Sequence, residues 1–528
     1  MPSLVTKKFR LNIADQIYES FNEASLTRYY VFIGRTTAFT NDSSPPTPSD
    51  SVQNVEFDSY RDMIAMKRVL AADVSYIVFR YNWTTGTVYK QYDDTDTSLY
   101  PTSTNATSNT TFYIITSSNY VYKCIDNNRG APSTVMPTYT GTSISTTADN
   151  YRWKFMYSVS SADADKFLVS SNIPVKTLSA NDGSAQWSVQ QAASNGSIDH
   201  ISITANGSNY LTTSNTFSSI TNSTVVVLKP NASATDAIYV KSTIYISSGL
   251  GAGQLRRVVK YTGSTRTLTV NGAFTVTPNT SAAYIVAPNV IIRGDSGSTT
   301  TNRATAYVSN CASGQVRKIT MISRGLHYAT ANVTISANSG SAATAVPMIS
   351  PPGGHGAAPV AELGAMSLLV NVRITGNEAN TFPSNNDFRV VGLIRDPLLR
   401  GGLVANASVI DQCTRLNVFA ASGDFTADEV ITGGTSGVKG RLVYFANTNT
   451  ARTKGLLKLI RVSTSGTGGF FSSGEVVTGA TSGKTATVNT IARPAVREYT
   501  GDIIYTENRT PVTRSPYQIE DIKLVVKF

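Results

Sequence analysis

The sequence has few of the residues that build metal sites, disulfides and redox centres. It contains three cysteines and three histidines in 528 residues, and no CxxC motif occurs. These residues are Cys124, Cys311, Cys413, His200, His327 and His355. No histidine has a second histidine or a cysteine at the spacing of metal ligands. The sequence therefore predicts no metal and no cofactor, and it indicates buried, inert thiols in a reducing compartment.

Long apolar segments are also absent from the sequence. No stretch of about 18 apolar residues occurs, so no transmembrane helix is expected. The first eight residues, MPSLVTKK, do not contain the apolar core of a signal peptide. We therefore expect a protein without a membrane partner.

Charge is sparse and scattered along the chain. Charged residues make up 15% of it, and 45 Lys and Arg against 34 Asp and Glu leave a net charge of +11. No run of five basic residues occurs, and the densest positions are 7–8 and 256–257. Nucleic-acid binding favours a clustered basic stripe. The pattern therefore predicts a solvated basic surface and no nucleic-acid partner.

Catalytic patterns are missing as well. No GxSxG nucleophile motif occurs. The carboxylate pairs at 93–94 and 520–521 are adjacent, so their side chains point apart on an extended chain. We therefore expect that the protein is not an enzyme. A glycosidase pair of carboxylates from two distant strands stays open as an alternative.

Ser, Thr and Asn are abundant and lie in short clusters between β-branched runs. This composition favours strands and exposed loops and disfavours long helices. The sequence predicts a mainly β fold: a β-sandwich core with a few short helices, plus inserted β-hairpin-repeat modules. Helices are expected from Asn12, from Ser59 through Leu70, and from Ser161. Strands are expected over 29–33, 76–81, 111–116, 120–125, 151–159, 366–374, 388–394 and 519–528.

The segment 478–491, TGATSGKTATVNTI, resembles a phosphate-binding loop. Such a loop needs four residues between its first glycine and Gly-Lys-Ser/Thr, and it must open a helix. Here Gly479 and Gly483 enclose three residues, and the β-branched segment 485–491 predicts a strand. A copy of the motif at 425–437 aligns with 471–483 and lacks Gly-Lys-Thr. The two copies therefore predict a pair of β-hairpins and no nucleotide site.

A second repeat lies in the middle of the chain. Segments beginning at Gly196 and Gly314 each combine an alternating strand with a glycine-containing turn that ends in a tyrosine, Tyr210 or Tyr328. The two repeats divide the chain into five predicted segments. These are 1–190, the first part of the β-sandwich core; 191–350, an inserted β-repeat module; 351–411, the continuation of the core; 412–492, an inserted paired-hairpin module; and 493–528, the C-terminal strand of the core.

Several short segments match a known pattern in the same order. They are 32–35 (FIGR), 45–52 (PPTPSDSV), 121–126 (VYKCID), 150–157 (NYRWKFMY), 388–398 (FRVVGLIRDPL), 501–512 (GDIIYTENRTPV) and 518–528 (QIEDIKLVVKF). Together they resemble the baseplate wedge subunit encoded by gene eight of T-even-like contractile-tailed phages. That family ends with a G-x-x-hydrophobic-Y-x-E-N-R-x-P segment and a final strand ending in Phe. The resemblance covers about 1–180, 360–400 and 495–528, and the two hairpin-repeat regions have no counterpart in the shorter family member.

The resemblance implies a β-sandwich core, a homodimer within each wedge, contacts with other baseplate wedge subunits, and no catalysis. It also implies a late structural protein of the virion, located in the baseplate of a contractile phage tail and assembled in the host cytoplasm. Two alternatives stay open. Ser/Thr/Gly-rich β repeats with scattered tyrosines also suit glycan contact, in a glycan-binding or host-attachment module of a phage tail. A tail-associated glycosidase is the other.

One polar cluster is a candidate subunit contact. Glu507, Asn508 and Arg509 precede Pro511 and the last predicted strand. One interpretation is a turn whose side chains cap its own backbone. The other is a contact between subunits, because Arg and Glu at a rim set the register between two proteins.

Overall fold

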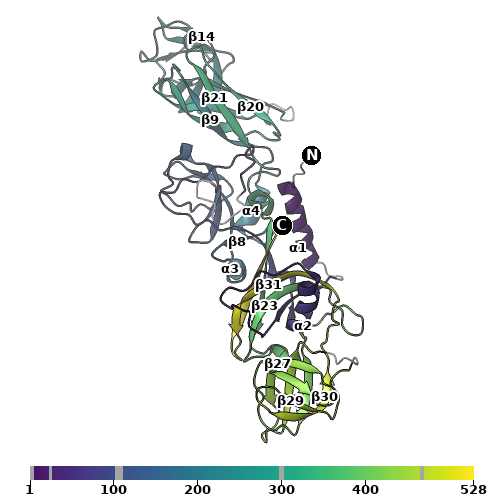
Figure 1. The fold of residues 1–528 in the computed structure, drawn as a ribbon. Helices are drawn as coiled ribbons and strands as arrows, with labels where there is room; N and C mark the ends of the chain where they lie inside the picture. Colours follow the sequence, from purple (N-terminus) through teal and green to yellow (C-terminus); the bar gives the residue numbers. More distant parts are fainter. Residues whose placement is uncertain (1–4, 23–26, 101–110, 296–301, 464–468) are drawn as a thin grey trace. The chain divides into compact units, whose positions relative to one another are not determined.

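The computed structural model describes residues 5–22, 27–100, 111–295, 302–463 and 469–528. The fold is mainly β, with several antiparallel sheets and a few short helices, as the sequence predicts (Figure 1). Two compact units make up the chain. Unit 1 comprises Met1–Ile77, Asp165–Phe167 and Met366–Phe528, and unit 2 comprises Val78–Ala164 and Leu168–Ala365. The unit boundaries differ from the five predicted segments, whose boundaries stay a prediction.

The larger sheet of unit 1 is built from segments that are far apart in the sequence. Its strand order is β24 (Val409–Asp411), β2 (Met63–Arg68), β1 (Tyr29–Gly34), β23 (Asp387–Arg395) and β31 (Asp502–Thr513). Every residue of β1 is buried, so both faces of the sheet are covered. One face forms a core cluster that includes Tyr30, Phe32, Met66 and Ile394.

A second sheet of unit 1 contains the C-terminal strand. Strand β32 (Ile519–Lys527) pairs with β22 (Ser367–Thr375) over nine residues, and β22 pairs in turn with β3 (Val74–Phe79). Leu524 is fully buried and Ile522 is nearly so. The strand predicted over 519–528 is therefore confirmed, and one of its faces is buried.

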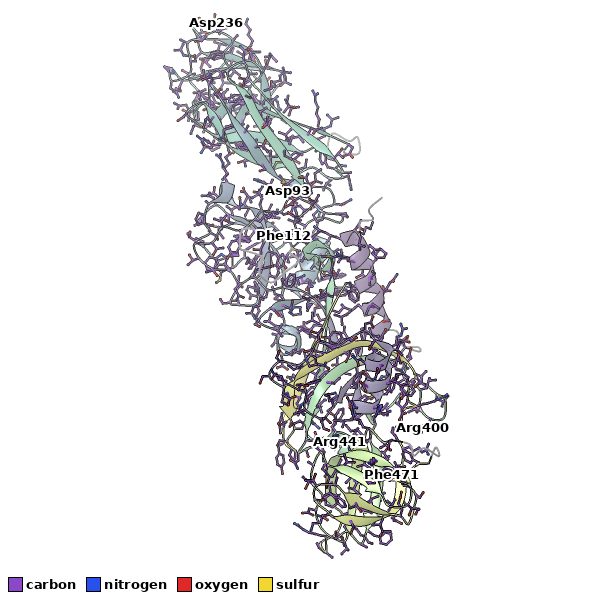
Figure 2. The ribbon with its side chains drawn as sticks, viewed as in Figure 1. Asp93, Phe112, Asp236, Arg400, Arg441 and Phe471 are labelled. Atoms are coloured by element: carbon purple, nitrogen blue, oxygen red, sulfur yellow. The ribbon has the colours of Figure 1, made fainter. Side chains whose placement is uncertain are left out.

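The paired hairpins close into a barrel within unit 1. The strand order around it is β25 (Thr414–Phe419), β28 (Lys454–Ile460), β27 (Lys439–Asn447), β26 (Val430–Gly433), β29 (Val476–Gly479) and β30 (Thr485–Ala492). The barrel has its own core, which includes Phe425 and its repeat equivalent Phe471, labelled in Figure 2. Strand β30 follows Lys484 directly, and it pairs with β29. The two predicted hairpins are therefore confirmed.

Two of the predicted helices differ from the structure. Helix α1 spans Lys7–Asn22, so Asn12 lies inside it and is not its N-cap. The Thr6 hydroxyl oxygen instead accepts a hydrogen bond from the Phe9 amide at 3.2 Å. The predicted helix from Ser59 through Leu70 is wrong beyond its first turn, because α2 ends at Asp62 and β2 follows.

The error over β2 has a physical reason. Met63, Ile64, Ala65 and Met66 are all buried, since both faces of this strand are covered. A continuous apolar run does not distinguish a buried strand from a buried helix. The third predicted helix is confirmed as α3 (Ser161–Phe167), which Ser160 caps by accepting a hydrogen bond from the Asp163 amide.

Three sheets lie within the described residues of unit 2. The first has the order β4 (Tyr113–Ile115), β5 (Tyr120–Asp126), β7 (Arg152–Ser158), β6 (Ile144–Thr146). The second has the order β10 (Thr213–Thr216), β16 (Ala283–Ala287), β13 (Thr243–Ser248), β14 (Leu255–Thr262), β15 (Thr267–Val270), β12 (Val225–Val227), β11 (Ser219–Ile220). The third has the order β19 (Gln315–Ser323), β18 (Thr305–Ala312), β17 (Asn289–Gly294), β20 (Ala331–Ser336), β21 (Ser341–Ile349), β9 (Ile198–Ser208).

The shorter elements of the chain are β8 (Asn172–Val175), α4 (Ala185–Gln191), α5 (Pro359–Leu363) and α6 (Glu378–Thr381).

The repeat in the middle of the chain has a packing reason. Strands β9 and β19 are its two alternating strands, and each leads to a buried tyrosine, Tyr210 or Tyr328. A Cβ on Gly207 would lie 2.6 Å from the Tyr210 ring, and one on Gly325 would lie 2.7 Å from the Tyr328 ring. Both glycines also have a positive φ. The turns therefore require glycine for backbone conformation and for space.

Candidate subunit-contact site

The candidate contact residues lie in the middle of a strand. In β31, Glu507 pairs with Val391 and Asn508 pairs with Val390 of β23. The interpretation of this cluster as a turn is therefore wrong. Strand β31 is the last of its sheet, a place where Pro511 is tolerated because proline donates no backbone hydrogen bond.

Two of the three side chains form an exposed ion pair. The Glu507 carboxylate lies 3.7 Å from the Arg509 Nε, and both side chains are more than a third exposed. The Tyr505 hydroxyl donates to the same carboxylate at 2.9 Å. Burial, and then the nearby Glu507, raises the pKa of Tyr505 to about 12. Because exposed pairs add little stability, the fold does not depend on the pairing of Glu507 with Arg509.

Asn508 has a structural role instead. Its side-chain amide donates to the carbonyl oxygen of Pro46 at 2.8 Å, and this bond holds the proline loop against β31. A cavity of about 470 Å³ lies beneath that loop, lined among others by Arg35, Asp62 and Asn508. The lining of this cavity therefore comes from both β31 and the end of β1.

The end of β1 is shaped by close backbone contact with α2. A Cβ on Gly34 would lie 2.7 Å from the carbonyl oxygen of Asp62, so this position requires glycine. Arg35 follows with a φ of 61°, and its amide donates to the same oxygen at 2.9 Å. The Arg35 guanidinium lies over the Phe39 ring, 4.2 Å from its centroid. This strained residue is thereby held between the loop and the sheet.

The buried carboxylate of Asp62 joins the sheet to the barrel. Its side chain is only 5% exposed, and it forms a bidentate pair with Arg461, whose Nη2 lies 2.7 Å from Oδ2. The hydrogen bonds that Arg461 donates to Asp62 raise the pKa of Arg461 above its ordinary value. A second link joins the Thr36 hydroxyl to Asp428 at 2.6 Å, and Arg441, labelled in Figure 2, pairs with Asp428 in turn.

The loop after β1 is held by a further bidentate pair. Arg389 of β23 donates to both carboxylate oxygens of Asp42, with distances of 2.8–3.0 Å. The hydrogen bond from Arg389 holds the pKa of Asp42 below its ordinary value. These pairs give the site a fixed shape and fixed charges, which suits binding to another protein.

An aromatic pair borders a second cavity of unit 1. Phe57 and Tyr499 meet edge to face with ring centroids 4.9 Å apart, and each is more than 40% exposed. They line a cavity of about 670 Å³ that also includes Asp58 and Arg461. Exposed aromatic rings beside an arginine are typical of the central residues of protein interfaces.

Sequence reasoning missed the partners in this site. It placed Asp62 inside the predicted helix from Ser59 through Leu70, whereas the partner of Asp62, Arg461, lies almost 400 residues away. It did not single out Arg389 or Asp42. The one available signal was the match at 32–35, since Gly34 and Arg35 are the residues that contact Asp62.

The cysteines and histidines of the chain lie outside this site. Cys124 and Cys413 are buried, Cys311 is partly buried, and burial raises the pKa of each thiol. His355 is buried beside Tyr92, and His200 lies 3.4 Å from Asp126. His327 has a φ of 65°. Among the described residues, no three His, Cys, Asp or Glu side chains gather as a metal site.

No protein-family model and no curated protein matches the chain. In the described part of the chain, the helices are too short or too polar to cross a membrane. The case for a function therefore depends on the geometry of the site and on the resemblance of its segments.

Proposed function

We propose that the chain is a structural subunit of a phage tail baseplate wedge. In this role it holds neighbouring wedge proteins together by protein–protein contacts, performs no catalysis, and acts as a homodimer in the virion. One observation supports the proposal above all: segments that resemble the wedge subunit, and that are far apart in the sequence, lie side by side in one sheet.

The register of that sheet makes the observation specific. Phe32 of β1 pairs with Gly392 of β23, which in turn pairs with Thr506 of β31. The proline loop joins the same group through the hydrogen bond from Asn508 to Pro46. One sheet and the proline loop bonded to it thus bring together four of the matching segments: 32–35, 45–52, 388–398 and 501–512. In unit 2, the matching segments 121–126 and 150–157 also pair with each other, as β5 and β7.

The surface of unit 1 offers suitable contacts. Glu507 and Arg509 are exposed on the last strand of the sheet, and Phe57 and Tyr499 are exposed beside a cavity. Charged pairs at a rim set orientation and association rate, whereas aromatic rings and arginines supply most of the binding energy. A subunit that bridges several neighbours needs surfaces of both kinds.

Assembly of tail particles with a charge-reversed subunit tests the proposal. We expect Arg509→Glu to leave the melting temperature unchanged and to reduce incorporation of the subunit into baseplates. Arg452→Glu is the matched control, because Arg452 also forms an exposed ion pair, with Asp424, but lies in the barrel loop. Gradient sedimentation of the particles measures incorporation. A wild-type chain that stays outside baseplates assembled from the same virion's proteins would contradict the proposal.

The homodimer is tested separately by sedimentation equilibrium of the purified full-length chain. We expect a dimer at micromolar concentration. A chain that remains monomeric at about 100 μM, where even a weak dimer forms, would contradict that part of the proposal alone.

A further inference from the structure

A polar cavity of about 470 Å³ lies within unit 2. The loop around η4 (Asn128–Gly130) forms one side of it, and strands β9 and β19 form the other. Asp93, labelled in Figure 2, also lines it. The cavity is large enough for one sugar residue and part of its neighbours.

A histidine and an aspartate meet in this cavity. The His200 Nδ1 lies 3.4 Å from an Asp126 carboxylate oxygen, and both side chains are largely buried. The other carboxylate oxygen of Asp126 accepts a hydrogen bond from the Asn128 amide at 2.9 Å. Burial lowers the pKa of His200, with Asp126 acting in the opposite direction and Arg152 and Lys318 in the same one. A neutral imidazole can both donate and accept hydrogen bonds to a ligand.

The cations that line the cavity are largely uncompensated. Lys90 pairs with Asp96. Arg129 donates to the side-chain oxygen of Asn206, and Arg317 donates to that of Gln315. In the described part of the chain, no carboxylate pairs with Arg129, Arg317 or Lys318. These three charges therefore face the cavity without an internal counter-ion.

The surrounding module strengthens the positive field. Residues 191–350 contain eleven Lys and Arg and three Asp, so they carry +8 of the net charge of +11. The three carboxylates are already used. Asp199 forms an ion pair with Arg324. Asp236 accepts a hydrogen bond from the Gly263 amide, and Asp295 accepts hydrogen bonds from two backbone amides. A field of one sign attracts anionic ligands to such a cavity.

Most of the other polar lining residues bear amides or hydroxyls, and three isoleucines, Ile201, Ile203 and Ile319, complete the lining. Gln91, Asn127, Asn150 and Ser202 are among the polar residues, and the described lining contains no Phe, Tyr or Trp side chain. Sites for single-stranded nucleic acid stack bases on aromatic rings, which this cavity does not offer. Amides and hydroxyls instead hydrogen-bond to a ligand rich in hydroxyl groups.

We propose that this cavity binds a carboxylated sugar residue of an acidic polysaccharide. Arg317 and Lys318 pair with the sugar carboxylate, while the amide side chains and His200 hydrogen-bond to its hydroxyl groups. The lining carries two more cations than carboxylates, which suits a ligand with one negative charge per sugar. This activity goes beyond a structural role in the baseplate, and it does not depend on that role.

Titration of the full-length chain with trigalacturonate, which carries one carboxylate per sugar, tests the proposal. We expect saturable binding that weakens about tenfold or more in Lys318→Glu, because a direct ion pair becomes a repulsion. Arg129→Gln should weaken it as well. Arg257→Glu is the matched control, since Arg257 is an exposed cation on β14 outside the cavity. We expect that control to bind within about twofold of the wild type, and all variants to melt at the wild-type temperature.

Three results would overturn the proposal. The first is no saturable binding of trigalacturonate at about 10 mM. The second is equal weakening by Lys318→Glu and Arg257→Glu, which would indicate a general charge effect. The third is equal binding of maltotriose, a neutral sugar of the same length, or tighter binding of oligo-dT.

Discussion

Glu429 and Glu475 occupy equivalent positions in the two barrel repeats, and each binds the turn of the other repeat. Glu429 accepts hydrogen bonds from the amides of Thr481 and Ser482, both at 2.8 Å. Glu475 accepts them from the amides of Thr435 and Ser436 at 3.3 and 3.0 Å. The serine hydroxyl of each turn donates to the same carboxylate.

This exchange gives a physical reason for the likeness of the turn at 478–485 to a phosphate loop. Their backbone amides do bind an anion, but the anion is a carboxylate from the same chain. The turns also require glycine, because a Cβ on Gly433 or Gly479 would lie 2.6 Å from the oxygen of Glu475 or Glu429. The carboxylates thereby join the two repeats into one closed barrel.

Replacing either glutamate should destabilise the barrel. In Glu429→Gln and Glu475→Gln, an amide nitrogen replaces one carboxylate oxygen, and two of the four donors lose their acceptor. An unsatisfied buried donor costs about 1–3 kcal/mol. Urea unfolding followed by circular dichroism measures the loss. Glu498→Gln serves as the control, because Glu498 lies outside the two turns. A glutamine variant as stable as the wild type would show that the exchanged contacts contribute nothing.

The same pair should make stability depend on acidity. Burial opposes ionisation of Glu429 and Glu475, but the hydrogen bonds from the turns outweigh it and lower the pKa of each below the ordinary value of 4.5. The stabilisation is therefore complete above about pH 4.5 and is lost as the pH falls through the lower folded-state pKa. We expect the melting temperature of the wild type to fall more steeply below pH 4.5 than that of the double Glu→Gln variant. Parallel curves would contradict this prediction.

The Gly-Lys-Thr sequence at 483–485 should bind no nucleotide. The amides of Thr481 and Ser482 already bind Glu429, and β30 follows where a phosphate loop needs a helix. Isothermal titration with ATP and magnesium should give no saturable heat, in the wild type and in Lys484→Ala alike. A micromolar dissociation constant that Lys484→Ala abolishes would contradict the prediction.

Loss of the Arg461 side chain should lower the free energy of unfolding more than loss of the Asp62 charge. Arg461→Ala leaves the Asp62 carboxylate buried with Arg35, at 3.7 Å, as its remaining ion-pair partner. The loss should therefore be smaller than the cost of about 3–5 kcal/mol for leaving a buried charge without any partner. The double variant Asp62→Asn/Arg461→Ala should recover part of that loss, because no buried charge remains. Chemical denaturation of the four proteins measures the coupling. Additive effects would contradict a direct interaction between the two side chains.

The last strand should tolerate a charge on one face only. Leu524 is fully buried in β32, and an unpaired charge there costs several kcal/mol, so Leu524→Asp should not fold. Ile519→Asp is the control, since Ile519 lies in the same strand and is 58% exposed. Soluble expression and thermal melting distinguish the two. A folded Leu524→Asp protein would show that β32 is not part of the core.

The sequence by itself determined the local features of this protein. Alternating β-branched residues predict strands because one face of each strand is buried, and glycine-containing turns between them predict hairpins. The mainly β class, the two barrel hairpins and the strands at Tyr29, Tyr120 and Ile519 were therefore predictable. Each of these signals lies within about ten residues of the chain.

Only the tertiary structure decided how distant segments meet. The run after Ser59 became a strand because β1 and β24 pair with its two edges. Glu507 lies in a strand because β23 supplies the hydrogen bonds that a turn would otherwise make internally. The partner of Asp62 is Arg461 because the closed barrel places it there. Pairings over hundreds of residues depend on the packing of the whole sheet and barrel, and no local pattern specifies them.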